Sequence, residues 1–154
     1  MEDILTNKNP FPVQKCQGKR LNKCLVCSSL EGDNPKISCK TNNVGYEVNC
    51  ETCKNVNKKK SYKGETARSG RLRGGEHLRD LKNKNPKSAL YKHKEAEHKN
   101  EHMDIKMSIS KGFKDALTRQ ANEGVRIFRE NKPTLMNSKS EMNHPKIPRI
   151  LVDI

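Results

Sequence analysis

Paired cysteines constrain the fold of this chain more than any other feature. Cys24 and Cys27 form one Cys-x2-Cys pair, and Cys50 and Cys53 form a second. Two such pairs let four thiolates converge tetrahedrally on one Zn²⁺ ion. Hydrophobic residues make up only 31% of the chain and its mean hydropathy is −1.02, so the core must be small. A bound metal would therefore supply stability that such a core cannot.

The choice of metal ligands has two solutions, because the chain has six cysteines, and free thiols without a metal are the remaining alternative. We favour a structural zinc site made of the two pairs named above. The alternative is an N-terminal site made of Cys16, Cys24, Cys27 and Cys39. Four sulfur ligands would close the coordination sphere, so either site would be structural and would do no chemistry itself.

The start of the chain and its hydropathy bear on the compartment. Residues 1–6 lack the charged and apolar regions of a secretory signal, and no apolar run reaches the roughly 20 residues that span a bilayer. We therefore expect an intracellular, nuclear protein with no membrane partner and no small-molecule cofactor. In such a compartment the thiols are reduced, which favours metal binding over disulfides.

A strong positive charge points to a polyanionic partner. The formal net charge is +14, and the densest basic run is Lys-Asn-Val-Asn-Lys-Lys-Lys at 54–60. Each Lys or Arg that neutralises a phosphate releases counterions, so we expect nucleic acid, and DNA in particular, as the partner. A solvated basic surface is the alternative, and charge alone does not separate DNA from RNA or acidic lipid.

Hydrophobic periodicity gives the expected order of elements. Val44, Tyr46 and Val48 alternate with more polar residues, as in a half-buried strand. The expected strands are 44–49, 61–64 and 103–109, and the expected helices are 71–83, 88–98 and 112–130. This β-β-α-α-β-α order predicts an α+β fold with a small antiparallel sheet flanked by helices and an N-terminal cysteine-rich zinc knuckle.

Composition divides the chain into three parts. Residues 1–15 have little periodicity and are interpreted as a disordered tail, and residues 16–43 are a cysteine-rich segment in which only loops and tight turns are evident. Residues 44–150 form the main domain, and Ile150-Leu151-Val152 would add a small edge strand. In the last helix, apolar residues from Ala116 to Phe128 recur at helical spacing and form one apolar face.

A set of short motifs follows this order of elements. Gly45-Tyr46 lies on the first strand and Tyr62-Lys63-Gly64 on the second. Arg73 and His77 are four residues apart on the next helix, so both lie on one face. Glu123 lies on the last helix, within Arg-Gln-Ala-Asn-Glu. The order of these motifs resembles the GIY-YIG endonuclease family, and especially the retroelement-associated form in which a cysteine-rich segment precedes the first tyrosine.

The resemblance covers about residues 16–150 and implies roles for particular residues. Tyr46 would be the base for an attacking water, and Arg73 would brace the phosphate. Tyr62 and His77 would orient phosphate and water or relay a proton. Glu123 would hold Mg²⁺ or Mn²⁺. Two further positions belong to the same pattern, Gly64 in the second tripeptide and Asn137 in a loop near the site.

The residue chemistry supports the same interpretation and leaves alternatives. Glu123 lies near the apolar face of its helix, where a lone carboxylate costs free energy unless it is paired or bound to a metal. A salt bridge to Arg119 or Arg126 is the simpler alternative. The two tyrosines could equally be cross-strand packing partners.

The sequence therefore predicts a metal-dependent DNA endonuclease derived from a mobile element. The alternative is a decayed nuclease that survives as a non-catalytic, zinc-dependent nucleic-acid-binding module. In both cases we expect His93 and His98 to lie on a helix surface rather than to bind metal, and Met103 and Met107 to lie in the core.

Overall fold

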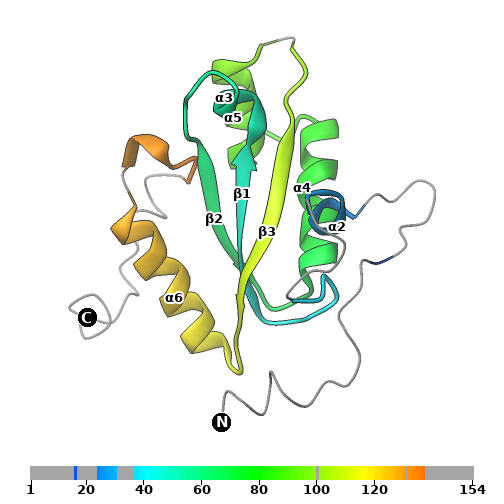
Figure 1. Ribbon diagram of the computed structural model, residues 1–154, viewed down its shortest axis with the longest axis vertical. Coiled ribbons are helices and arrows are strands. Elements are labelled where there is room, and N and C mark those ends of the chain that lie inside the picture. The colour runs from blue at the N-terminus through cyan, green and yellow to red at the C-terminus, as the bar shows by residue number, and fades with distance from the viewer. Residues whose placement is uncertain (1–15, 17–23, 31–36, 100, 131, 138–154) are drawn as a thin grey trace.

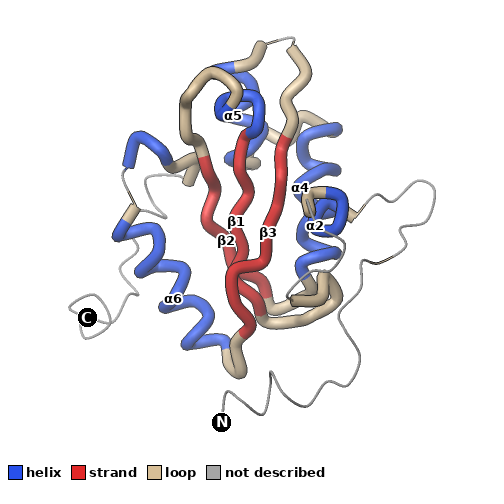
Figure 2. Tube along the Cα trace, in the orientation of Figure 1, coloured by secondary structure: helices blue, strands red, loops and turns tan. Residues whose placement is uncertain are grey.

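The fold is built around a three-stranded antiparallel sheet (Figure 1). The computed structural model describes residues 16, 24–30, 37–99, 101–130 and 132–137. The strands are β1 (Val44–Cys50), β2 (Ser61–Thr66) and β3 (Ile105–Gly112). Strand β1 lies in the middle, between β2 and β3, and Figure 2 shows the three strands side by side.

The central strand sends its side chains alternately to two faces. Val44, Tyr46 and Val48 are fully buried and belong to the face covered by helices α2 and α4. Gly45 belongs to the opposite face, where Arg126 of helix α6 approaches it. The register shifts between Gly45 and Tyr46 against β3, as expected for a β-bulge, and Tyr46 pairs with Gly64 of β2.

Each of the three long helices is capped at its N-terminus by a side chain that accepts a hydrogen bond from a backbone amide. Ser69, Ser88 and Asp115 cap these helices, and each accepts a hydrogen bond from the amide three residues later. The helices are α4 (Gly70–Lys82), α5 (Ala89–Glu97) and α6 (Ala116–Arg129). Helices α4 and α6 lie on opposite sides of the sheet (Figure 1). None of the helices among the described residues is long and apolar enough to cross a membrane.

Two single-turn helices start from cysteines. At the start of α2 (Leu25–Ser28), the sulfur of Cys24 accepts a hydrogen bond from the amide of Cys27. At the start of α3 (Glu51–Lys54), the sulfur of Cys50 accepts one from the amide of Cys53. A short 3₁₀ helix, η1 (Lys132–Thr134), follows α6. The Cys-x2-Cys spacing therefore builds two local turns that point a pair of sulfurs in one direction.

The α+β class and the small antiparallel sheet are confirmed, but the expected order of elements is incomplete. The observed order is α2-β1-α3-β2-α4-α5-β3-α6-η1. Helices α2 and α3 were not predicted because four residues are too few for a periodic signal, and their cysteine caps hold them instead. Helix α6 begins at Ala116 rather than at residue 112, because β3 extends to Gly112 and Asp115 supplies the cap. The predicted tail at 1–15 and the edge strand at 150–152 lie outside the described residues.

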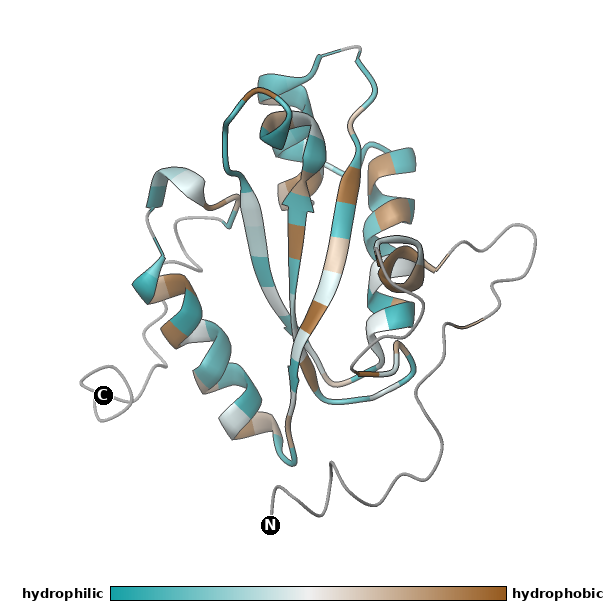
Figure 3. Ribbon diagram, in the orientation of Figure 1, coloured by the Kyte–Doolittle hydropathy of each residue, from teal (hydrophilic) through white to brown (hydrophobic). Residues whose placement is uncertain are grey.

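Helix α6 buries Ala121, Gly124 and Ile127 together with the cation Arg119, which corrects part of the predicted apolar face. Leu117 is 70% exposed and Phe128 is 59% exposed, whereas Arg119 is buried. The reason is pairing across the interface, because the Arg119 guanidinium donates to the Glu65 carboxylate and to Asn43. Apolar and polar residues alternate along α6 in Figure 3.

The core lies between the sheet and helices α2 and α4. Leu25, Val26, Val48 and Met107 are buried together there, and Met107 is in the core as expected. At Gly74 of α4, a Cβ atom would lie 3.1 Å from Cβ of Leu25 and 3.2 Å from Sδ of Met107. The glycine therefore lets α4 approach the sheet closely, and α4 carries two of the predicted site residues.

Candidate active site and metal centres

A chain of hydrogen bonds joins β1 to α4 at the phenol of Tyr46. The hydroxyl oxygen lies 3.1 Å from Nε of Arg73 and 2.8 Å from Nε2 of His77. Because the Nε–H of arginine can only donate, the phenol oxygen accepts from Arg73. In the tautomer of His77 that leaves Nε2 unprotonated, the phenol donates its proton to that nitrogen. Three of the predicted site residues, Arg73, Tyr46 and His77, are therefore joined by hydrogen bonds.

Burial keeps both acid–base groups of this hydrogen-bonded set neutral at pH 7. Tyr46 is fully buried, and burial raises its pKa to about 12 although the Arg73 cation opposes the shift. Burial, assisted by the charge of Arg73, lowers the pKa of His77 to about 4. Tyr46 is therefore a neutral phenol and His77 a neutral imidazole, which is the protonation state that the hydrogen bonds require.

Gly64 is required by the position of the Tyr46 ring. A Cβ atom at residue 64 would lie 2.7 Å from Cε2 of Tyr46 and closer still to Cζ and the hydroxyl oxygen. The ring therefore lies directly over the backbone of β2. Tyr62 packs beside it, with ring centroids 6.3 Å from Tyr46 and 5.5 Å from His77. The aromatic residues are packing partners, as the simpler alternative proposed, and Tyr46 also has the polar contacts described above.

Helix α6 carries Glu123, whose charge acts on the same phenol. Its side chain is half-buried, and its negative charge adds to the effect of burial in raising the pKa of Tyr46. Arg126, one turn further along α6, donates from Nη2 to the backbone oxygen of Tyr46 at 3.0 Å. The other predicted salt-bridge partner, Arg119, pairs with Glu65. Helix α6 is therefore joined to Tyr46 through Arg126, and Glu123 lies one turn before Arg126 on the same helix.

Asn137 fixes the segment after η1 against β2. Its Nδ2 donates to the backbone oxygen of Lys63 at 2.8 Å, and its Oδ1 accepts the amide of Lys63 at 3.0 Å. The side chain of Lys63 forms ion pairs with Glu47 and Glu130. Asn137 thus holds the neighbouring Met136, whose amide donates to the backbone oxygen of Ser61 at 2.7 Å.

A pocket of about 560 Å³ opens beside this group of residues. Tyr62, Arg73 and His77 line one part of it. The remaining lining comes from the end of α4, the α4–α5 connection, the first turns of α5 and Met136. Tyr46 is covered by these side chains, so a ligand in the pocket would meet Arg73 and His77 first.

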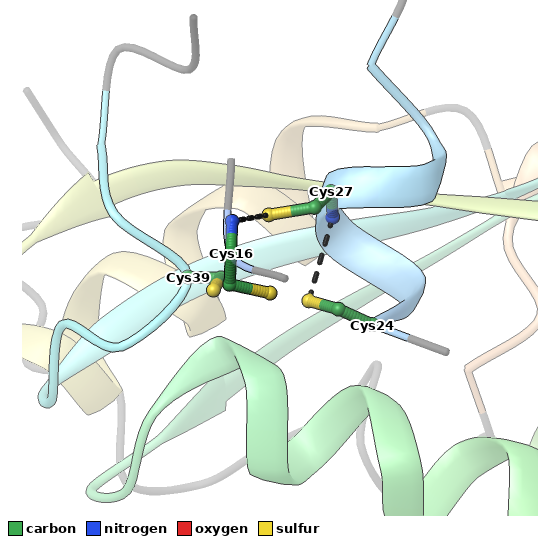
Figure 4. Close-up of side chains that lie close together, drawn as sticks. All are labelled: Cys16, Cys24, Cys27 and Cys39. Atoms are coloured by element: carbon green, nitrogen blue, oxygen red, sulfur yellow. Dashed lines mark hydrogen bonds between the residues drawn. The ribbon is translucent and has the colours of Figure 1, made fainter. Parts of the chain in front are cut away.

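The first candidate metal centre consists of four cysteines around α2 (Figure 4). Their sulfur atoms all lie within 4.8 Å of one another. A tetrahedral Zn²⁺ with Zn–S bonds of about 2.3 Å places its sulfurs about 3.8 Å apart, so the group fits with a small contraction. The amide of Arg71, at the start of α4, donates to the backbone oxygen of Cys39 at 2.8 Å and joins the centre to that helix. The ligands are Cys16, Cys24, Cys27 and Cys39.

The second candidate centre joins α3 to α5. Nε2 of His98 lies 3.4 Å from Sγ of Cys50 and 3.3 Å from Sγ of Cys53, and Nε2 of His93 lies 3.4 Å from Sγ of Cys53. In a tetrahedral zinc site with ordinary bond lengths the sulfur–nitrogen separation is about 3.6 Å. Both clusters could therefore hold a metal such as zinc.

These two centres overturn the ligand set that the sequence favoured. The pairs Cys24–Cys27 and Cys50–Cys53 do not share a site, because each completes its own tetrad. The alternative N-terminal set is the one that the structure assembles. His93 and His98 were predicted to be surface residues, but they are only 8% and 7% exposed and lie against Cys53. Their spacing, His-x4-His after a Cys-x2-Cys pair, was the sequence signal that could have identified them.

Comparison with known proteins adds no assignment. No family model, curated protein or solved structure matches this chain. The resemblance to the GIY-YIG family therefore depends on the sequence motifs alone. The functional argument depends on the residues and distances described above.

Proposed function

We propose that this protein is a metal-dependent DNA endonuclease of GIY-YIG type. The observation that carries the proposal is the phenol of Tyr46, held between Arg73 and His77 beside a pocket that the last two residues line. Hydrolysis of a phosphodiester needs a cation against the phosphate and a route for a proton. Arg73 supplies the first of these, and the Tyr46–His77 pair supplies the second.

The donor set near the phenol suits a hard divalent cation. Mg²⁺ in nucleic-acid enzymes is commonly held by one or two carboxylates, with water and substrate phosphate completing its shell. Glu123 provides such a carboxylate, half-buried and close enough to Tyr46 to influence its pKa. We assign Glu123 as the residue that would hold Mg²⁺ or Mn²⁺. The bound ion would supply Lewis-acid activation of the phosphate and acidify a bound water.

The remaining chemistry belongs to the side chains themselves. Once the side chains that cover Tyr46 move aside, a water that reaches the phenol oxygen would give it a proton while the phenol proton passes to Nε2 of His77. At rest this transfer is unfavourable, because the pKa of Tyr46 is about 12 and that of His77 about 4. A phosphate placed against Arg73 offsets part of the positive charge that lowers the pKa of His77. Substrate binding would therefore favour the transfer.

Relaxation of supercoiled plasmid with Mg²⁺ tests this proposal. We expect the wild type to nick the plasmid and Glu123→Gln to lose cleavage while it still binds DNA, since the amide keeps the shape of the side chain and removes its charge. The matched control is Glu101→Gln, an exposed carboxylate remote in sequence from the site residues, which should cleave normally. Metal-dependent cleavage by Glu123→Gln at the wild-type rate would refute the assignment of the metal ligand.

The second candidate function is a zinc-dependent nucleic-acid-binding module without catalysis. Two four-ligand clusters and a net charge of +14 favour it, because closed metal sites of this kind are structural. The plasmid assay separates the two functions. Binding of DNA without strand scission by the wild type, with either Mg²⁺ or Mn²⁺, would support the binding module.

A further inference from the structure

Two lysines without acidic partners lie in the pocket beside the Tyr46 group. Lys87 in the α4–α5 connection and Lys92 in α5 both line it, and both side chains are exposed. Among the described residues, neither ammonium group forms an ion pair with a carboxylate. Their positive charges are therefore available to a ligand.

Other cations near the site have an acidic partner within the fold. Arg73 pairs with Glu76 at 3.0 Å, and Lys63 pairs with Glu130 at 3.2 Å. Ion pairing within the fold explains these cations, but it does not explain Lys87 or Lys92. The α5 side of the pocket is therefore lined by positive charge that no carboxylate of the described residues balances through an ion pair.

The acidic group in the pocket does not cancel this excess. Asp80 is the carboxylate among the lining residues, and it accepts a hydrogen bond from Nδ2 of Asn85 at 3.1 Å. The two lysines exceed this single negative charge. The pocket, at about 560 Å³, is also larger than one phosphate group needs.

We propose that Lys87 and Lys92 bind a backbone phosphate next to the one that Arg73 engages, so that the nucleic-acid strand crosses the pocket from α4 to α5. This inference rests on the proposed function for the role of Arg73, but the phosphate contact itself is a matter of binding. An anionic backbone suits the site because lysines contact phosphate as mobile point charges and need no fixed geometry. The two contacts would set the register of the strand relative to Tyr46.

The test is the salt dependence of binding to a short fluorescent DNA duplex, measured without divalent metal. The slope of log K against log salt is negative, and each lost phosphate contact reduces its magnitude by about 0.9. Because the two lysines share one phosphate, we expect Lys87→Gln/Lys92→Gln to reduce the magnitude of the slope by about 0.9, and Lys87→Arg/Lys92→Arg to keep it. The matched control is Lys82→Gln/Lys114→Gln, which removes the same charge from exposed lysines that do not line the pocket and should change the slope little.

Two results would overturn the proposal, namely an unchanged slope in the pocket variant or an equal loss in the control variant. Repeating the titration with single-stranded DNA and with RNA identifies which backbone binds best, and a uniform loss across all three supports a phosphate contact. Plasmid cleavage is scored separately. A slope of reduced magnitude in a protein that never cuts DNA would leave the phosphate site standing and refute the nuclease function.

Discussion

Replacing Gly64 with alanine should disrupt the candidate active site more than any other single-methyl change. The new Cβ would lie 2.7 Å from Cε2 of Tyr46 and nearer to two other atoms of that side chain, distances that real Cβ atoms essentially never show. The ring cannot turn aside easily, because it is fully buried and its hydroxyl is bonded to Arg73 and His77. Overpacking of this kind costs about 1–3 kcal/mol. Loss of two hydrogen bonds adds about 1 kcal/mol each, so we expect a total near 3–5 kcal/mol.

Urea unfolding of the metal-loaded protein measures this effect. The matched control is Gly75→Ala, because a Cβ there meets nothing within 4 Å and residue 75 lies inside helix α4. Alanine stabilises a helix interior by about 0.5–1 kcal/mol relative to glycine, so the two variants should change stability in opposite directions. If Gly64→Ala unfolds at the same urea concentration as the wild type, the close approach of Tyr46 to β2 is wrong.

Two further predictions concern metal content and pH. Zinc-loaded protein should contain about two Zn²⁺ ions per chain, as measured by a colorimetric zinc assay after unfolding. Cys39→Ser and Cys53→Ser should each lower that content to about one. Loss of both ions in either variant would contradict two independent centres. The pKa of His77 is about 4 in the folded state against an ordinary value of 6.5. Between these pH values the unfolded chain binds a proton that the folded chain excludes. The free energy of unfolding therefore falls as the pH drops from about 6.5 to about 4. The wild type should lose up to about 3 kcal/mol more than His77→Gln over this range in parallel urea titrations, and identical losses in the two proteins would contradict the buried neutral imidazole.

Local sequence patterns were sufficient for most of the scaffold. The alternation at Val44, Tyr46 and Val48 identified β1, and Ser88 correctly marked the start of α5. These features succeed because strand alternation and helix capping depend on residues a few positions apart. The proximity of Tyr46 to Arg73 and His77 was expected from the family resemblance. The four-residue spacing within one helix supported only the proximity of Arg73 to His77.

The errors arose where the outcome depends on distant partners. Each Cys-x2-Cys pair offers two sulfurs, but which other ligands complete its tetrad is decided by the packing of α2 and α5. The orientation of α6 failed for a related reason. Periodicity reports where apolar residues lie, but it does not reveal that Arg119 is buried by its pairing with Glu65 while Leu117 and Phe128 stay exposed.

The second candidate metal centre closes a long loop of the chain, and this loop can change in length. Its ligands Cys50 and His98 are 48 positions apart, and the segment between them contains Tyr62, Arg73 and His77. The entropy of closing such a loop grows only logarithmically, so doubling its length would cost about 0.6 kcal/mol. The exposed turn at 54–59 lies within this loop and away from the pocket. Insertions at this turn should therefore be tolerated, and the hairpin between the two tyrosine-bearing strands could lengthen while a metal bound at this centre would keep both ends of the loop together.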